Sequence, residues 1–250
     1  WLLNYTNPMA ILTMGMLKAT KIKTVGLCHS VQVCVPELFE HLGIKDQYAG
    51  INHMAWLLEI NRNGKDFYPE IRRLASEIAN PHKDSVRFEL MKHFGYYITE
   101  SSEHNAEYHP YFIKKNYPEL IEQLQIPIDE YLRRCVDQIA GWETQRDEIV
   151  NDGSLEHTRS REYASYIMDA ITTGTPTMIA GNVLNKGLIT NLPEDCCVEV
   201  PCLVDKNGVQ PTYVGKLPTQ LAALNRTNIN VQELTVEAAM TLEKDKIYQA

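Results

Sequence analysis

The pattern of apolar and polar positions divides the chain into two regions with different predicted secondary structure. In the first region, a short apolar run (residues 1–5) is followed by a nearly continuous apolar stretch (9–20) and a second β-like run (23–28). The residue before a proline is biased away from the helical region, so the first run ends before Pro8. This strand, helix, strand order predicts the end of a parallel α/β sheet, in which ligands gather at the carboxyl ends of the strands.

From about residue 50 the pattern predicts antiparallel strands mixed with helices, an α+β region that forms a second domain. Residues 49–60 predict a strand that runs into Asn63-Gly64, a preferred sequence of tight hairpin turns. Apolar residues at helical spacing, and short apolar runs bounded by turn residues, indicate the other elements. We expect helices at 35–44, 70–94, 118–150, 160–172 and from about 217 onward, and strands within 177–193 and 196–211.

The composition of the 250-residue chain is that of an ordinary globular protein, sufficient for one large domain or two modest ones. A net charge of −8 argues against a nucleic-acid partner, because phosphate binding needs a basic surface. No run reaches the ~18 consecutive apolar residues that a membrane span requires. The first residues lack the basic segment and cleavage site of a secretory signal, and we expect the sequence to begin inside a domain.

The cysteines sit in apolar or helical contexts, without the density of a secreted disulfide scaffold. We therefore expect reduced thiols and a cytoplasmic location. The adjacent pair Cys196 and Cys197 is expected to pack in the core of a strand. The six cysteines are Cys28, Cys34, Cys135, Cys196, Cys197 and Cys202.

Two loop segments carry side chains that could hold a metal ion. Cys28 and His29 directly follow the second apolar run, and His53 lies in the segment AGINHM, flanked by glycine and asparagine. Thiolate and neutral imidazole are good ligands for divalent ions, and two protein ligands leave positions for water and substrate. The alternative is two ordinary loops, with a buried cysteine, a hydrogen-bonded histidine and His29 in a capping role. The spacing alone leaves both interpretations open.

Polar and aromatic residues alternate densely in the segment YYITESSEHNAEYHPYF, residues 96–112. Hydroxyl-binding groups interleaved with rings suit a sugar, whose C–H faces stack on aromatic side chains. The alternative is a solvated helix start in which Ser101 or Ser102 caps an acidic first turn.

Tyr163 follows Arg161 near the start of a predicted helix. A tyrosine acts as a base only if cationic neighbours lower its pKa, and Arg161 could supply such a field. The alternative for Tyr163 is ordinary packing at the core or its rim.

Six motifs taken together resemble glycoside hydrolase family 4, and within it the α-galactosidase (melibiase) branch. The resemblance covers essentially the whole chain and is specific in the order and spacing of the motifs. They are NYTNPMAILT, KTVGLCHSVQ, AGINHMAWLLE, GYYITESSEHNAEYHPYF, SREYAS and LAALNRTNINVQ.

The resemblance implies an NAD⁺- and Mn²⁺-dependent hydrolysis of α-galactosides, in a family outside two-carboxylate glycosidase chemistry. Hydride leaves the sugar C3 for NAD⁺, the acidified C2 proton is removed, the C1 group departs, and water addition and re-reduction complete the cycle. The implied metal ligands are Cys28 and His53, and the metal acts as a Lewis acid on the sugar oxygens. The implied general acid is His29, where relatives acting on phosphorylated sugars have aspartate. The implied base is Tyr163, helped by Arg161.

Further contacts follow from the same resemblance. Sugar-binding candidates are Asn7, Asn52, Arg161, Glu103 and His104, and cofactor-binding candidates are Asn4 and Thr6. The implied fold class is α/β, with the end of a Rossmann-like NAD-binding domain (1–27) followed by a lactate/malate-dehydrogenase-like α+β domain (28–250) for catalysis and oligomerisation. The glycine-rich phosphate loop of such a domain is not among these residues. The implied assembly is a homodimer or homotetramer, without nucleic-acid or membrane partners.

Three other functions remain open from the sequence. The chain could be an α-glucosidase, α-glucuronidase or α-galacturonidase of the same family. More remotely, it could be a lactate/malate-type 2-hydroxy-acid dehydrogenase, which needs no metal-binding cysteine. It could also be a non-catalytic sugar-binding relative, although the presence of Cys28, His53 and Tyr163 together argues against that.

Overall fold

The computed structural model describes residues 1–32, 45–77, 84–151, 160 and 162–250 of the chain. All nine described strands form one mixed sheet, in the order β1-β2-β7-β8-β3-β4-β5, with β6 paired to β4 and β9 to β8. The strands are β1 (Leu2–Asn4), β2 (Thr24–Leu27), β3 (Lys45–Ile51), β4 (Met54–Arg62), β5 (Lys65–Asp66), β6 (Tyr97–Ile98), β7 (Thr177–Leu184), β8 (Cys197–Asp205) and β9 (Gly208–Pro211).

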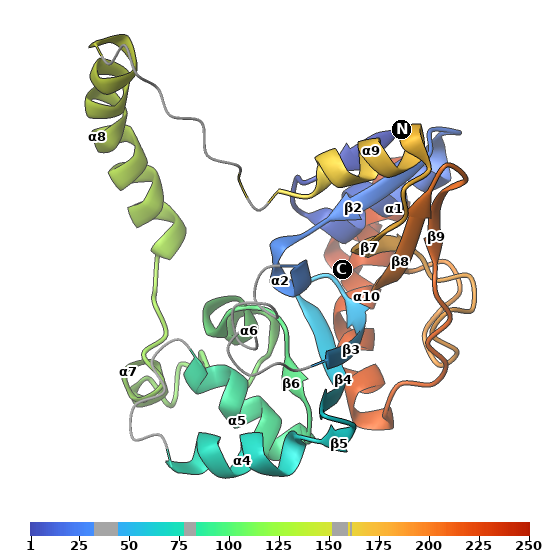
Figure 1. Ribbon diagram of the computed structural model, residues 1–250. Coiled ribbons are helices and arrows are strands. Elements are labelled where there is room, and N and C mark those ends of the chain that lie inside the picture. Colours follow the sequence, from blue (N-terminus) through green and yellow to red (C-terminus); the bar gives the residue numbers. More distant parts are fainter. Residues whose placement is uncertain (33–44, 78–83, 152–159, 161) are drawn as a thin grey trace.

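Only the first two strands of this sheet run parallel. β1 pairs with β2 through the crossover helix α1 (Met9–Ala19), which accounts for the predicted strand, helix, strand order. From β2 onward every pairing in the sheet is antiparallel, beginning with β2 against β7. The parallel α/β start and the antiparallel remainder therefore share one continuous sheet (Figure 1).

Helices cover the sheet and extend from it (Figure 1). α1 contacts the long helix α10 (Thr219–Thr241); α1 also packs on β7 and β8, whereas α10 packs on β3. One helix, α8 (Glu130–Asn151), stands apart from the rest of the molecule. The remaining helices are α2 (His29–Gln32), α4 (Tyr68–Glu77), α5 (Ser85–Phe94), α6 (Ser102–Tyr108), α7 (Glu119–Gln123), α9 (Ala164–Thr173) and α11 (Lys244–Gln249).

The β3–β4 hairpin is anchored to α10 by a buried polar contact. The indole Nε1 of Trp56 donates a hydrogen bond of 2.9 Å to Asn225 Oδ1, and Asn225 Nδ2 donates one of 3.1 Å to the carbonyl of Met54. Both side chains are fully buried, so these bonds satisfy groups that would otherwise be costly to bury. The contact holds the tip of the hairpin against the helix.

Several predicted elements have different boundaries in the structure. The predicted strand 49–60 is a hairpin, since Asn52 and His53 form a turn between β3 and β4. The predicted helix 118–150 is two helices, α7 and α8, because Gln125 and Asp129 adopt left-handed φ angles of 53° and 58°. The Asn63-Gly64 turn is confirmed, with left-handed φ at both residues.

Other expectations are partly testable. The helical region 70–94 contains α4 and α5, separated by residues outside the described part of the chain. The predicted helix 35–44 lies outside it as well. Predicted strands within 177–193 and 196–211 are confirmed as β7, β8 and β9, and α10 begins close to the expected residue. None of the described helices combines the length and apolarity needed to cross a bilayer.

Candidate metal centre

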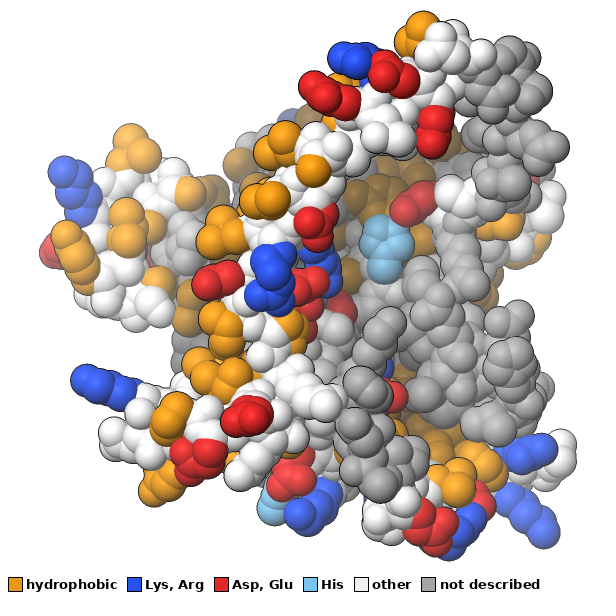
Figure 2. Space-filling model, turned by 90° about the vertical axis from the view of Figure 1, so that its left-hand side faces the viewer, with side chains coloured by type: hydrophobic (Ala, Val, Ile, Leu, Met, Phe, Trp, Pro, Cys, Tyr) orange, Lys and Arg blue, Asp and Glu red, His pale blue; other side chains and the backbone are white. Residues whose placement is uncertain are grey.

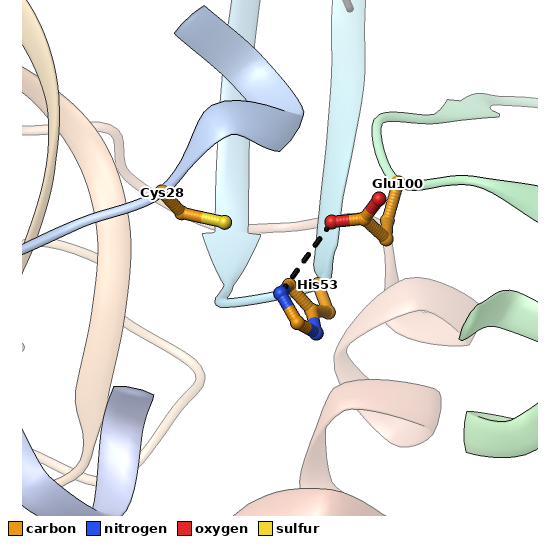
Figure 3. A group of neighbouring side chains, drawn as sticks. All are labelled: Cys28, His53 and Glu100. Atoms are coloured by element: carbon orange, nitrogen blue, oxygen red, sulfur yellow. Dashed lines mark ion pairs between the residues drawn. The ribbon is translucent and has the colours of Figure 1, made fainter. Parts of the chain in front are cut away.

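Three potential metal ligands from separate loops converge beside the sheet (Figure 3). The sulfur of Cys28, a ring nitrogen of His53 and a carboxylate oxygen of Glu100 all lie within 4.8 Å of one another. His53 Nε2 is 3.5 Å from Glu100 Oε2, and all three side chains are almost fully buried. The structure thus brings together Cys28 and His53, which the sequence singles out, and adds a carboxylate.

The position of Cys28 follows from the end of β2. All four residues of β2 are buried, and the chain turns at Cys28 into the short helix α2. The hydroxyl of Tyr163 donates a hydrogen bond of 2.9 Å to the Cys28 carbonyl, and Ser30 Oγ lies 3.4 Å from the sulfur. The Tyr163 hydrogen bond therefore fixes the main chain of Cys28, and Ser30 contacts its sulfur.

The position of His53 follows from the two-residue turn of the β3–β4 hairpin. Ile51 pairs directly with Met54, so only Asn52 and His53 lie between the strands. His53 adopts a left-handed φ of 63°, which is uncommon outside glycine, asparagine, aspartate and histidine. The ring stacks on that of His104, with centroids 5.0 Å apart and planes 6° apart. These contacts direct Nε2 toward Glu100 and Cys28.

Glu100 is the potential ligand that the sequence analysis missed. It lies between β6 and α6, where its Oε1 accepts a 2.7 Å hydrogen bond from the Ser101 main chain. The 96–112 segment drew attention as a sugar contact or a capped helix start. The capping is confirmed, since Ser101 Oγ accepts a hydrogen bond from the His104 N–H. An acidic residue immediately before that cap was the available signal.

The three side chains fit a divalent cation. Thiolate, imidazole and carboxylate together suit a borderline ion, and three protein ligands leave positions for water or substrate oxygens. His53 Nδ1 is buried without a hydrogen-bond partner in the described structure. A metal-bound histidine normally donates from its second nitrogen, so a cation on Nε2 would require a water or substrate oxygen to accept this hydrogen.

A second buried carboxyl lies behind the three ligands. Glu199 of β8 pairs in register with Asn182 of β7 on one side and Gly50 of β3 on the other. Asn182 pairs in turn with Gly26, where an added Cβ would lie 2.6 Å from Met9 Sδ. The Gly26 end of this row therefore faces α1, and the absence of a side chain at Gly26 leaves room for Asn182.

Glu199 is fully buried, and neither carboxylate oxygen has a hydrogen-bond partner in the described structure. Burial raises the pKa of Glu199 well above its usual range; the nearby Cys28 adds to this shift and His53 opposes it. The amide of Asn52, a predicted sugar contact, lies near the Glu199 carboxyl and opposes the pKa shift, but its buried Nδ2 makes no hydrogen bond of ordinary geometry in the described structure. Orphaned polar groups in one region are typical of a site that binds water or a ligand.

His29 and Tyr163 lie on either side of Tyr5. The exposed ring of His29 stacks on Tyr5, and its Nε2 is 2.7 Å from Glu162 Oε1. The buried hydroxyl of Tyr163 donates to main-chain carbonyls, and burial raises its pKa far above the usual range, with Glu199 adding to the shift. Arg161, predicted to assist Tyr163, lies outside the described residues.

The other predicted contacts lie around this centre with varied partners. His104 Nδ1 pairs with Glu107 at 2.9 Å, while Glu103 pairs with Arg134 of α8 at 3.2 Å. Asn52 lines a cavity of about 160 Å³ between α1 and α10, next to Tyr108. Of these three described candidates, His104 is the one whose ring contacts a potential metal ligand, through its stacking on His53.

The N-terminal candidates form a turn at the carboxyl end of β1. Asn4 and Thr6 hydrogen-bond to each other, and Asn7 Oδ1 accepts a hydrogen bond from the Met9 N–H at the start of α1. Their place beside the parallel strands fits a ligand at the strand ends. These residues alone do not form a nucleotide site.

Sequence models of known families cover the chain almost end to end. Residues 48–250 match the "family 4 glycosyl hydrolase C-terminal domain", and residues 1–44 match "family 4 glycosyl hydrolase". The chain belongs to glycosyl hydrolase family 4. The family resemblance seen in the motifs is thereby confirmed.

Two curated members of family 4 illustrate the relationship. An α-galactosidase of Bacillus subtilis is 62% identical over 100% of this chain and 59% of its own length. An α-galactosidase of Rhizobium meliloti is 34% identical over 97% of this chain and 53% of its own length. The chain thus spans between half and three fifths of these family 4 relatives.

Solved structures show the same fold. The candidate glucosidase lplD of Bacillus subtilis superposes with a TM-score of 0.85 at 24% identity, over 100% of this chain and 63% of that one. A 6-phospho-β-glucosidase of Thermotoga maritima, solved with manganese, NAD⁺ and glucose-6-phosphate, gives 0.73 at 17%, over 98% and 58%. These likenesses confirm the predicted α/β class of this family 4 chain, a Rossmann-like end joined to an α+β region.

Proposed function

We propose that this family 4 protein is an NAD⁺- and Mn²⁺-dependent α-galactosidase. The convergence of Cys28, His53 and Glu100 into one buried donor set carries the proposal. The substrate class rests on the relative with 62% identity, which is named an α-galactosidase. The proposed requirement for manganese and NAD⁺ is based on the solved relative that contains both.

When bound, a divalent cation and NAD⁺ would supply a Lewis acid and a hydride acceptor. The chain's own residues would do the rest. Cys28, His53 and Glu100 would hold the cation. Asn7, Asn52, Glu103, His104 and Arg161 are proposed around the sugar, and Asn4 and Thr6 toward the cofactor.

His29 is proposed as the general acid at the leaving oxygen. Its exposed imidazole pairs with the Glu162 carboxylate at 2.7 Å, a partner that would orient the ring. Glu162 was not anticipated as a site residue. The pair supports a proton donor close to the metal loop.

Tyr163 is proposed as the base that removes the C2 proton. Its hydroxyl lies 2.9 Å from the Cys28 carbonyl, which places it in the same loop region as the metal ligand. Burial favours the neutral phenol, so proton abstraction requires that the hydroxyl exchange its main-chain acceptor for the substrate and that a neighbouring positive charge lower its pKa.

The experiment uses the full natural chain with p-nitrophenyl α-galactoside, NAD⁺, Mn²⁺ and a thiol reductant. Hydrolysis should require all three additives, and substrate deuterated at C2 should exchange its label with solvent. Activity that persists in EDTA without NAD⁺ would exclude the reaction. Faster hydrolysis of α-glucosides, α-glucuronides or α-galacturonides in the same assay would instead assign the specificity to another branch of the family; one relative is named an α-galacturonidase.

We further propose a cytoplasmic homodimer or homotetramer acting on a small-molecule glycoside. All the described cysteines, including Cys28, are free thiols, which suits a reducing compartment. Residues 1–27 are proposed as the end of the nucleotide-binding domain and 28–250 as the catalytic and oligomerisation domain. The change from parallel to antiparallel pairing at β2 supports this boundary.

A further inference from the structure

The helix α8 exposes an unusual amount of apolar surface. None of its 22 residues is buried, and it projects from the body of the molecule (Figure 1). Leu132, Ile139 and Trp142 are 62%, 74% and 56% exposed. Figure 2 shows apolar side chains gathered along one side of this helix. Globular proteins rarely leave such a stripe in water unless another surface covers it.

The stripe has the spacing of a helix-pairing seam. Within α8, apolar residues recur at alternating intervals of three and four from Leu132 to Ile149, broken once by Arg146. This seven-residue repeat is the pattern by which one helix packs along another helix. The charged residues of the first half, such as Arg133, Arg134 and Asp137, fall outside the seam. The seam positions are Leu132, Cys135, Ile139, Trp142, Arg146 and Ile149.

We propose that α8 of one molecule packs antiparallel along α8 of a second copy of this chain. The area of the exposed stripe fits such an interface. Burying its apolar side chains would remove on the order of 800 Å² per copy, which is the share of one partner in a standard interface. Those side chains are Tyr131, Leu132, Val136, Ile139, Trp142, Ile149 and Val150.

The antiparallel direction follows from the single charged seam position. In a parallel pair Arg146 would face Arg146 of the partner subunit, placing two like charges at one layer of the seam. Antiparallel pairing centred between Ile139 and Trp142 sets these two residues against each other across the dyad, and likewise Leu132 against Ile149. It places Arg146 opposite Cys135. The stripe is then complementary to itself.

The base of α8 is fixed in a direction that leaves the stripe free. Arg134 pairs with Glu130 at 3.1 Å and with Glu103 of α6 at 3.2 Å. These ion pairs lie on the face opposite the seam. The proposed interface does not depend on the glycosidase reaction, although it would supply the contact of the proposed homo-oligomer.

The test compares Ile139→Glu with Thr144→Glu in the full natural chain. Both add one acid to exposed positions of α8, but only Ile139 lies in the seam. Sedimentation equilibrium should show that Ile139→Glu weakens self-association by at least ~30-fold, the loss expected at an interface hot spot, whereas Thr144→Glu does not. Far-UV circular dichroism checks that both variants fold. A monomeric wild type, or equal association of both variants, overturns the proposal.

A crosslinking experiment tests the direction. Arg146→Cys should allow a mild oxidant to join Cys135 of one copy to the new thiol of the other, giving a covalent dimer on non-reducing gels. Arg146→Ser, which adds no thiol, should not crosslink. Efficient crosslinking of that control through Cys135 alone would show a parallel pair and overturn the antiparallel arrangement.

Discussion

At the residue scale, the metal centre combines two side chains that the sequence identifies with one that it does not. Cys28 and His53 stand out because thiol and imidazole next to strand ends are chemically distinctive. Glu100 is one of several acids in a polar segment, and only the fold shows that it, rather than Glu103 or Glu107, reaches the other two ligands. Glu199 was not predicted as a site residue for the opposite reason, since it is a single glutamate within an otherwise mostly apolar strand.

Replacing Glu100 with glutamine should weaken Mn²⁺ binding roughly 10- to 100-fold while the fold persists, because the amide keeps the shape but loses the charge. Isothermal titration with Mn²⁺ measures the change. Glu107→Gln serves as the control, since Glu107 is exposed and pairs with His104. Equal affinities in the wild type and Glu100→Gln would remove Glu100 from the ligand set.

Glu199→Gln should change how stability depends on pH. Because burial raises the folded-state pKa of this carboxyl, its contribution to stability is complete below about pH 4.5 and declines as pH rises toward the folded pKa. Glutamine does not titrate, so the melting temperature of Glu199→Gln should fall less than that of the wild type between pH 5 and pH 8. Thermal unfolding in EDTA measures this, with the exposed Glu59→Gln as control. Parallel pH profiles of Glu199→Gln and the wild type would contradict the assignment.

At the element scale, the β3–β4 hairpin places His53, and α10 fixes the hairpin. The prediction of one strand over 49–60 failed because the residues on both sides of the turn, 49–51 and 54–57, are buried and lack polar side chains, so that only Asn52 and His53 mark the turn. The prediction of one helix over 118–150 failed for another reason. The charge-rich helical pattern continues across it, and only Pro127 hints at the interruption.

Asn225→Ala should lower the free energy of unfolding by about 2–3 kcal/mol, because it removes two buried hydrogen bonds and leaves the Trp56 indole without its acceptor. Mn²⁺ affinity should fall as well, since the hairpin tip loses its anchor next to His53. Urea unfolding and metal titration measure the two effects. Asn228→Ala, one turn along α10 and half-buried, is the matched control and should cost less than about 1 kcal/mol. A similar cost in both variants would mean that the Trp56 contact is not special.

At the scale of the whole molecule, the fold class was predictable because short motifs report local chemistry and strand order. The exposed apolar side of α8 was not, although the seven-residue repeat of α8 is present in the sequence. The segment reads as an ordinary charge-rich helix until the structure shows that nothing within the described chain covers its apolar side.

Pairing through α8 predicts that thermal stability depends on protein concentration. Between ~1 and ~100 µM the melting temperature of the wild type should rise by several degrees, because association stabilises the folded state by mass action. Ile139→Glu should melt at one temperature throughout this range. Differential scanning fluorimetry across a dilution series measures both, and a flat wild-type series would contradict an associating fold.

The projecting helix also has a consequence for the lifetime of the protein. Arg133, Arg134 and Arg146 are trypsin sites with side chains more than half exposed on an element that packs little against its own body. Local opening of such an element costs little free energy, so trypsin should cleave α8 faster in a solitary molecule than in a paired one, where the partner stabilises the helix. The protein would then be degraded faster at low concentration, where it is monomeric, than at high concentration, where it is paired.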